Sequence, residues 1–245
     1  MSMIINILEH LMHGESSITE IKDKLNFNEP ILPYLLWLEK MGFVNRKLIE
    51  QKQYELISSR WSITSQGKAY LEFIKKNKEL PREETIPTVN LVCTIPVELK
   101  ESDIFRYSAV LVDVVEDILL SAKKEVIITS PYIDQTAIPF IKKINKNVKI
   151  KILTEKISTD LERLKSTNKN IVIKKLKKID EKTRVQLYQV HAKFICVDDS
   201  VCLVMSANIK ATSLYHNFEV GIMTKDKNII TSLKTIFEIL YSKIE

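Results

Sequence analysis

Apolar residues recur at helical spacing near the start of the chain and give way to shorter apolar runs further on. Residues 4–12, 18–25 and 32–38 each place aliphatic side chains three or four positions apart, which predicts three helices. Two short strands are expected within residues 43–63, and a further helix follows Thr64, whose hydroxyl is suited to cap it. The first third of the chain is therefore expected to contain three helices, a two-stranded ribbon and a last helix.

This order of elements in residues 1–78 is that of a winged helix-turn-helix domain, and residues 38–44 and 61–67 resemble prokaryotic regulators of that class. In such a domain the third helix enters the major groove of DNA and the ribbon touches the backbone. The ribbon carries basic residues suited to phosphates, namely Arg46, Lys47, Lys52 and Arg60. We therefore predict that this domain contacts DNA, with dimerisation or protein binding as the alternative.

The rest of the chain alternates between strand and helix patterns. Prolines and acidic residues in residues 79–104 predict a linker, with a possible edge strand at 89–95. Helices are expected at residues 110–119, 138–144, 159–164 and 229–240, and strands at 126–129, 148–153, 171–173 and 220–224. This alternation predicts a layered α/β/α domain over residues 105–245, and no internal repeat is apparent within it.

Charge is distributed unevenly along the chain. The net charge is +6, but residues 121–200 alone carry 18 basic and 9 acidic side chains. A polyanion is the natural partner for such an excess, whereas the plainer alternative is an ordinary solvated surface. The lysines that we predict to contact nucleic acid are Lys142, Lys143, Lys146, Lys174 and Lys175.

The cysteines and the hydropathy pattern bear on the compartment. Cys93, Cys196 and Cys202 are odd in number and lack a metal-ligand spacing, so we expect free thiols that pack as small hydrophobic side chains. No apolar run approaches the roughly 20 residues that a membrane span needs, and no signal peptide is evident. These features predict a cytoplasmic, reduced protein that makes no membrane contact.

Polar residues suited to phosphate chemistry lie within residues 191–219. His191 and Lys193 are two positions apart, which places both side chains on one face of an extended strand. Ser206 and Asn208 repeat that spacing after a second apolar run. An imidazole, an ammonium, a hydroxyl and an amide are therefore expected to meet at one end of a hairpin.

These residues resemble the signature of the phospholipase D superfamily, which is His-x-Lys-x4-Asp, then Gly-Ser-x-Asn and, further on, Asn-x-Glu. The matching positions are His191, Lys193 and Asp198, followed by Ser206, Asn208 and Glu219. Met205 takes the place of the motif glycine, and a side chain there could crowd the phosphate.

The resemblance implies a mechanism that needs neither a metal nor a cofactor. Two motifs face each other, so a chain with one motif would pair with a second copy across a twofold axis. His191 would attack phosphorus, and its counterpart would protonate the leaving oxygen. Lys193, Asn208 and Ser206 would hold the phosphate oxygens, and Glu219 would fix the tautomer of His191. Asp198 is expected to tie strand ends together.

The basic region and the winged helix favour nucleic acid over lipid as the substrate, and DNA over RNA. The function that we predict is a metal-independent, homodimeric DNA endonuclease or phosphodiesterase. The alternative is a transcription regulator whose phospholipase D-like domain serves dimerisation or ligand sensing, and Met205 is the feature that favours it.

Overall fold

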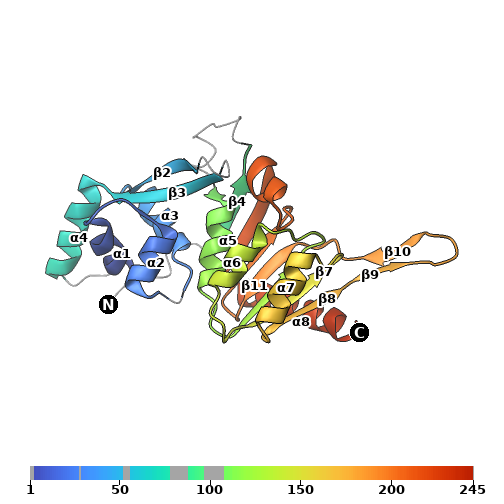
Figure 1. Ribbon diagram of the computed structural model, residues 1–245. Helices are drawn as coiled ribbons and strands as arrows, with labels where there is room; N and C mark the ends of the chain where they lie inside the picture. The colour runs from blue at the N-terminus through green and yellow to red at the C-terminus, as the bar shows by residue number, and fades with distance from the viewer. Residues whose placement is uncertain (1–2, 28, 52–55, 78–87, 97–107, 245) are drawn as a thin grey trace.

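The N-terminal part of the chain folds as three helices, a ribbon and a fourth helix (Figure 1). The computed structural model describes residues 3–27, 29–51, 56–77, 88–96 and 108–244. The elements are α1 (Met3–Leu11), β1 (Ser16–Ser17), α2 (Ile18–Leu25), α3 (Leu32–Lys40), β2 (Val44–Gln51), β3 (Leu56–Ile63) and α4 (Ser65–Asn77). The three strands form one sheet in the order β1-β3-β2. The expected ribbon and its flanking helices are present.

Local capping explains where two of these helices begin. Ser17 and Glu20 form the complete capping box ahead of α2, since each side chain accepts a hydrogen bond from the backbone of the other. Thr64 Oγ1 accepts a hydrogen bond from Gly67 N at the start of α4. Gly67 packs so closely on the backbone oxygen of Phe43 that an added Cβ would lie 2.0 Å from it. No larger residue fits there without moving the ribbon.

The remaining elements build an eight-stranded mixed sheet in the order β5-β4-β13-β12-β11-β6-β7-β8. Its strands are β4 (Val89–Thr94), β5 (Ala109–Val110), β6 (Glu125–Thr129), β7 (Lys149–Thr154), β8 (Ile171–Lys175), β11 (Phe194–Val197), β12 (Val201–Met205) and β13 (Glu219–Thr224). The helices are α5 (Leu111–Leu120), α6 (Ala137–Lys143), α7 (Thr159–Thr167) and α8 (Lys227–Ser242), with a π-helical turn, η4, at Thr212–His216.

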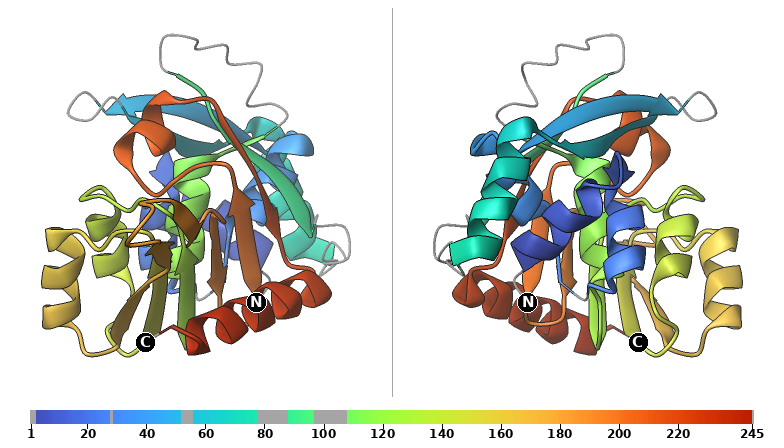
Figure 2. Two further views of the ribbon diagram at one scale, coloured as in Figure 1. Left: turned by 90° about the vertical axis from the view of Figure 1, so that its right-hand side faces the viewer. Right: turned by 90° about the vertical axis from the view of Figure 1, so that its left-hand side faces the viewer.

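Helices lie on both faces of this sheet, which confirms the layered α/β/α architecture (Figures 1 and 2). On one face, side chains of α5 and α6 pack against Ile128 and Ile195. On the other face, α8 packs Ile230 and Phe237 against a cluster that includes Cys196. Alternating side chains of each strand therefore enter two separate cores, as the pleat requires. No helix in the described ranges is both long and apolar enough to span a membrane.

Helix α5 joins the two halves of the molecule. The Lys22 ammonium of α2 lies 2.6 Å from the Asp117 carboxylate, and both side chains are buried. The same carboxylate accepts hydrogen bonds from the backbone N–H groups of Ile31 and Leu32 at the start of α3. A second buried carboxylate on α5, Asp113, accepts from Ser59 N in the ribbon. The winged-helix part is thus fixed to the large sheet domain through buried, charge-assisted contacts.

Helix α3 is enclosed rather than presented to solvent. Its residues Leu32–Leu35 and Leu38 are buried, and only Lys40 is exposed. In winged-helix domains the third helix enters a DNA groove, but here Leu36, Trp37 and Glu39 are only half-buried and Lys40 alone is exposed, so α3 presents little surface to a groove. The physical reason is that α3 is apolar on nearly all sides, so it packs against both its own domain and α5.

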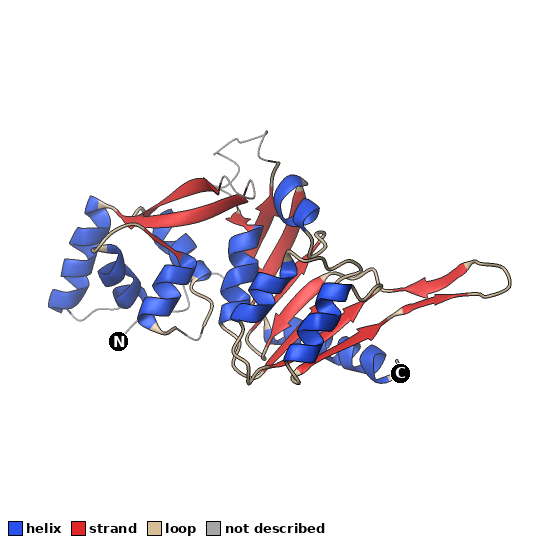
Figure 3. Cartoon of the chain, in the orientation of Figure 1, coloured by secondary structure: helices blue, strands red, loops and turns tan. Residues whose placement is uncertain are grey.

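Two further features differ from expectation. Strands β9 (Lys177–Ile179) and β10 (Gln186–Gln189), which the polar sequence did not reveal, form a separate two-stranded hairpin that projects from the body (Figure 3). Cys196 and Cys202 are joined by a disulfide, so the expectation of free thiols is wrong for this pair. The two residues stand directly opposite each other on β11 and β12 with a Cα–Cα distance of 4.1 Å, close enough to be bridged. Cys93 is a buried free thiol.

Candidate active site

The chemically active side chains lie at one end of the strands of the large sheet, which we call the polar edge. Strands β11 and β6 pair Phe194 with Thr129, so the start of β11 lies beside the end of β6. Because β12 runs antiparallel to both β11 and β13, its end lies at the same edge as their starts. Residues that precede β11, follow β12 or open β13 are therefore neighbours in space. The predicted catalytic residues at those places are His191, Lys193, Ser206, Asn208 and Glu219.

His191 and Lys193 occupy the segment that leads into β11. The Lys193 ammonium donates a hydrogen bond to the backbone oxygen of His191 at 2.7 Å, and Lys193 O accepts one from Met205 N. The His191 side chain is exposed. Partial burial lowers the pKa of Lys193, while the nearby Glu219 carboxylate opposes that shift. An exposed histidine and a partly desolvated lysine thus lie two residues apart on this segment.

Ser206 and Glu219 form a second polar pair at the same edge. Ser206 Oγ donates to the Glu219 carboxylate and accepts a hydrogen bond from Val220 N at 3.1 Å. Asn217 Nδ2 donates to the other carboxylate oxygen at 3.2 Å. In this structure the carboxylate is therefore held by Ser206 and Asn217, and its predicted contact with His191 stays a prediction.

Asn208 lies on the loop after β12, which a neighbouring loop holds in place. Ile209 N donates to Ser130 Oγ at 3.2 Å, and Ala211 N donates to the Asp134 carboxylate at 3.1 Å. The Asn208 amide oxygen is buried and has no hydrogen-bond partner within the described ranges. Sequence reasoning missed Ser130 and Asp134 as supports, although Ser130 directly follows a predicted strand, where polar residues commonly shape a site.

Met205, which replaces the motif glycine, points into the core between the sheet and its helices. Its side chain is buried among apolar residues. The residue opposite it on β13 is Gly221, where an added Cβ would lie 3.0 Å from Met205 Cβ. The missing side chain of Gly221 makes room for Met205, so the methionine does not crowd the polar edge.

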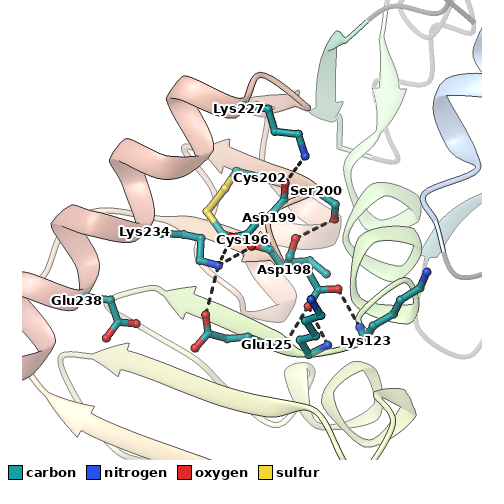
Figure 4. A network of polar contacts seen from close by, with 12 residues as sticks. Lys123, Glu125, Cys196, Asp198, Asp199, Ser200, Cys202, Lys227, Lys234 and Glu238 are labelled. Carbon is teal, nitrogen blue, oxygen red and sulfur yellow. Dashed lines mark hydrogen bonds and ion pairs between the residues drawn. A yellow bond between two sulfur atoms is a disulfide. The ribbon is translucent and has the colours of Figure 1, made fainter.

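Asp198 follows β11 in the hairpin turn, whereas His191 precedes that strand, so the two lie at opposite ends of it. Figure 4 shows the contacts around Asp198. It adopts a left-handed conformation with φ of 51° in the turn between β11 and β12. Its carboxylate accepts hydrogen bonds from the backbone N–H groups of Lys123, Lys124 and Glu125 at 2.8–3.0 Å. This geometry ties the hairpin turn to the segment that opens β6, away from the reacting groups.

The basic residues predicted to contact nucleic acid fall into two groups. Some are committed to internal partners: the Arg46 guanidinium binds Glu39 and Ser108 O, Arg60 pairs with Glu15 and Glu20, Lys143 pairs with Glu116, and Lys174 donates to backbone oxygens near the C-terminal end of α8. Lys143 is nevertheless exposed, and Lys47, Lys142, Lys146 and Lys175 are exposed as well. Lys52 lies outside the described residues. The exposed lysines are the ones placed to meet a polyanion, and Lys143 would have to leave Glu116 to do so.

A tyrosine and a lysine that could not be predicted from the sequence lie together near these residues. Tyr132 is exposed, and the Lys210 ammonium lies 5.8 Å from the centre of its ring. Tyr132 follows β6 and Lys210 follows β12, so both belong to the loops that support Asn208. A cation over an aromatic ring at this position offers a surface for a planar or anionic group.

Comparison with known proteins adds three similarities among solved structures. NucT from Helicobacter pylori is 19% identical with a TM-score of 0.48, covering 54% of this chain and 88% of NucT. Nuc from Salmonella typhimurium, described as a phospholipase D family member, is 13% identical with a TM-score of 0.46, covering 64% and 95%. TrmBL2, described as an archaeal chromatin protein, is 15% identical with a TM-score of 0.40, covering 100% and 94%. None of these likenesses is close enough to support a function.

A family model gives a firmer result. None of the curated proteins matches the sequence. The model described as "Cardiolipin synthase, PLD-like domain" matches residues 115–241, which is just over half of the chain and includes all of the polar edge. This match, together with the layered sheet and the set of residues at its edge, identifies the chain as a member of the phospholipase D superfamily.

Proposed function

We propose that this protein is a phosphodiesterase that cleaves nucleic acid, most simply a DNA endonuclease, through a covalent phosphohistidine. The observation that carries the proposal is the meeting of His191, Lys193, Ser206, Asn208 and Glu219 at one edge of the sheet. The donor set combines an imidazole, an ammonium, a hydroxyl and an amide, groups that bind a phosphate anion directly. This chemistry requires no bound metal.

The reaction proceeds in two displacements. In the first, a ring nitrogen of His191 forms a bond to phosphorus while the bond to the leaving oxygen breaks, and a second histidine gives that oxygen a proton. In the second, water attacks phosphorus, gives its proton to the second histidine and releases His191. Both histidines return to their starting states, so the cycle balances as hydrolysis of one phosphodiester bond.

The remaining residues stabilise charge. Lys193 and Asn208 are placed to hold the non-bridging oxygens as negative charge develops on them. Ser206 adds a hydroxyl beside them, and its bond to Glu219 keeps that hydroxyl oriented. Glu219 would then accept a hydrogen bond from a ring N–H of His191 once a substrate displaces its present partners, which would fix the reactive tautomer.

The second histidine must come from a second chain. The motif occurs once in each chain, so each chain contributes one His191. The reaction, however, needs both a nucleophile and a separate acid. A homodimer with its twofold axis near the polar edge would bring two copies of His191 to one phosphate. The active site in this proposal is therefore shared.

Nucleic acid is favoured as the substrate by charge. The exposed lysines Lys142, Lys146 and Lys175 lie on the domain that carries the polar edge, within the most basic part of the sequence. Lys47 extends the basic surface onto the winged-helix ribbon. Because α3 is enclosed, contact between that domain and DNA would run through the ribbon and be insensitive to base sequence.

The regulator alternative loses its main support in this structure. It rested on Met205 in place of the motif glycine, and the Met205 side chain is accommodated in the core. It also needs a winged helix that reads bases, and α3 is mostly buried, with Lys40 as its one exposed residue. The phosphodiesterase is therefore the function that we put forward.

Incubation of the purified protein with plasmid and single-stranded oligonucleotides in excess EDTA tests the proposal. We expect cleavage that EDTA leaves intact and that His191→Ala abolishes. Activity that requires added magnesium, or that survives His191→Ala, would contradict the mechanism. The Asp198→Asn variant serves as a control, because its side chain lies at the far end of the same hairpin.

A further inference from the structure

The loop after β6 lies against the polar edge at two points. At the first, the last residue of β6 pairs with the first residue of β11, which directly follows Lys193. At the second, Ile133 forms a parallel bridge with Ile209, which directly follows Asn208. Tyr132 occupies the loop between these two points. It therefore lies beside both of the residues that are placed to hold a phosphate.

The backbone of this loop is fixed by short hydrogen bonds. Ser130 Oγ donates to Tyr132 O at 2.9 Å. Pro131 O accepts from Glu155 N at 3.1 Å and from Thr154 Oγ1 at 3.0 Å, which ties the loop to the end of β7. The position of the Tyr132 backbone is therefore set before any ligand binds.

The hydroxyl end of Tyr132 is directed at a buried carboxylate. Glu155 is 6% exposed and pairs with the Lys177 ammonium through Oε1. Lys177, and to a smaller degree the Tyr132 hydroxyl, lower the pKa of Glu155, while burial acts in the opposite direction. Oε2 of Glu155 has no hydrogen bond of good geometry among the described residues, so the hydroxyl lies near the carboxylate without ideal alignment.

The ring of Tyr132 is nevertheless open to solvent. The residue is 47% exposed, and the Lys210 ammonium lies 5.8 Å from the ring centre. That distance is close to the outer limit of about 6 Å for a cation over an aromatic ring. A flexible surface lysine, rather than the core, thus reaches this ring face, and a ligand can reach it as well.

A fixed aromatic ring with a mobile cation next to a phosphate-binding site suits a nucleotide. Nucleobases stack on aromatic side chains whatever their sequence, while basic side chains bind the phosphates between them. Lys210 lies two residues after Asn208, which places its ammonium beside the phosphate site. A quaternary ammonium, as in a choline headgroup, suits the ring less well, because the Lys210 cation repels it.

We propose that Tyr132 is the stacking platform for the nucleobase next to the scissile phosphate, and that Lys210 leaves the ring to bind the phosphate on the far side of that base. This inference rests on the proposed function, since it names how the same site holds its substrate. The ring positions the substrate and takes no part in bond breaking.

The test measures binding by fluorescence anisotropy in the His191→Ala background, where the probe stays intact. Two probes carry equal numbers of phosphates: a short oligothymidylate, and an oligomer of the same length with abasic sugars. We expect Tyr132→Leu to weaken binding of the oligothymidylate about 5- to 100-fold and of the abasic probe less than about twofold. Lys210→Met should weaken the binding of both probes by the same factor.

Two further variants serve as controls. Tyr132→Phe keeps the ring, so its affinity for the oligothymidylate should stay within about threefold of the parent, which guards against a folding defect in Tyr132→Leu. Phe73→Leu removes a ring that is 51% exposed on α4, outside the large sheet domain, and should change neither affinity.

The outcomes separate this inference from the proposed function. A loss in Tyr132→Leu that is equal for the two probes, or absent from both, would overturn the platform even if the wild type cleaves nucleic acid. A loss confined to the oligothymidylate would uphold the platform, and if the wild type cleaves no nucleic acid it would still refute the nuclease. A protein that binds neither probe, but binds phosphocholine through Tyr132, would overturn both in favour of a lipid headgroup.

Discussion

The Lys22 ammonium and the Asp117 carboxylate lie 2.6 Å apart, 3% and 0% exposed, where the winged-helix part meets the large sheet domain. A buried carboxylate that also accepts two backbone N–H groups is costly to leave without its cation. The two parts of the chain are therefore expected to unfold together, as one cooperative unit.

Replacing Lys22 with Met should lower the free energy of unfolding by about 3–5 kcal/mol, because Asp117 then stays buried without a counter-charge. Urea unfolding followed by circular dichroism measures the effect. Lys75→Met is the matched control, since Lys75 pairs with Glu9 at the surface and such pairs contribute at most about 1 kcal/mol. Equal losses for the two variants would show that the buried contact does not couple the domains.

Asp113 predicts an unusual pH dependence at the same junction. Burial raises its pKa to about 7, so near neutral pH the folded protein holds a proton that the unfolded chain releases above about pH 4. Its contribution to stability is therefore present at low pH and lost as the pH rises toward 7. Asp113→Asn should remove this loss and gain on the order of 1–4 kcal/mol relative to wild type between pH 4 and 8. Parallel stability curves for the two proteins over that range would contradict the assignment.

Much of the fold could be predicted because its signals are local. The capping box of Ser17 and Glu20, the amphipathic stripes of α5 and α8, and the buried strands all follow from short-range patterns. The burial of α3 could not be predicted, because it depends on a partner helix more than 70 residues later in the chain. The β9–β10 hairpin was missed because its lysine-rich sequence lacks a clear alternation of apolar and polar residues.

In the candidate site too, the local patterns could be predicted, but the contacts between distant segments could not. A spacing of two residues was enough to expect His191 and Lys193 together, and the hairpin brings Ser206 to the same edge. The supports of Asn208, which are Ser130 and Asp134, come from a loop after β6 whose position depends on the sheet order. The Cys196–Cys202 bond was missed because oxidation cannot be inferred from an odd number of cysteines, even when the strands themselves are found.

The two ends of the β11–β12 hairpin predict opposite kinds of defect. Lys193→Ala or Asn208→Ala should lower the cleavage rate on the order of 10²–10³-fold with little change in melting temperature, as expected for lost transition-state donors. Asp198→Asn should lower the melting temperature and leave the rate nearly unchanged, because its partners are backbone groups far from the phosphate. Rate measurements below each variant's melting temperature separate the two effects. A large rate loss in Asp198→Asn would contradict this division.

Exposed lysines should contribute to nucleic-acid binding, whereas a lysine that is bound within the protein should not. Lys142→Ala and Lys146→Ala should each weaken binding to an oligonucleotide and reduce the slope of log affinity against log salt, because fewer counterions are released. Lys174→Ala should leave the slope unchanged, since its ammonium donates to Tyr241 O and Ile244 O and lies over the Tyr241 ring. Fluorescence anisotropy at several salt concentrations gives both quantities. A salt slope that none of these variants alters would place the nucleic acid elsewhere on the surface.

The shared active site is the central claim, and a mixed dimer tests it most directly. Co-expression of wild type and His191→Ala under two different affinity tags, followed by purification on both, yields a dimer with one histidine nucleophile and no opposing acid. The same procedure with two wild-type chains provides the reference. We predict that the mixed dimer cleaves at less than about a tenth of the reference rate, since both histidines act on one phosphate. A mixed dimer with half the reference rate would show that each chain works alone, and would contradict this account.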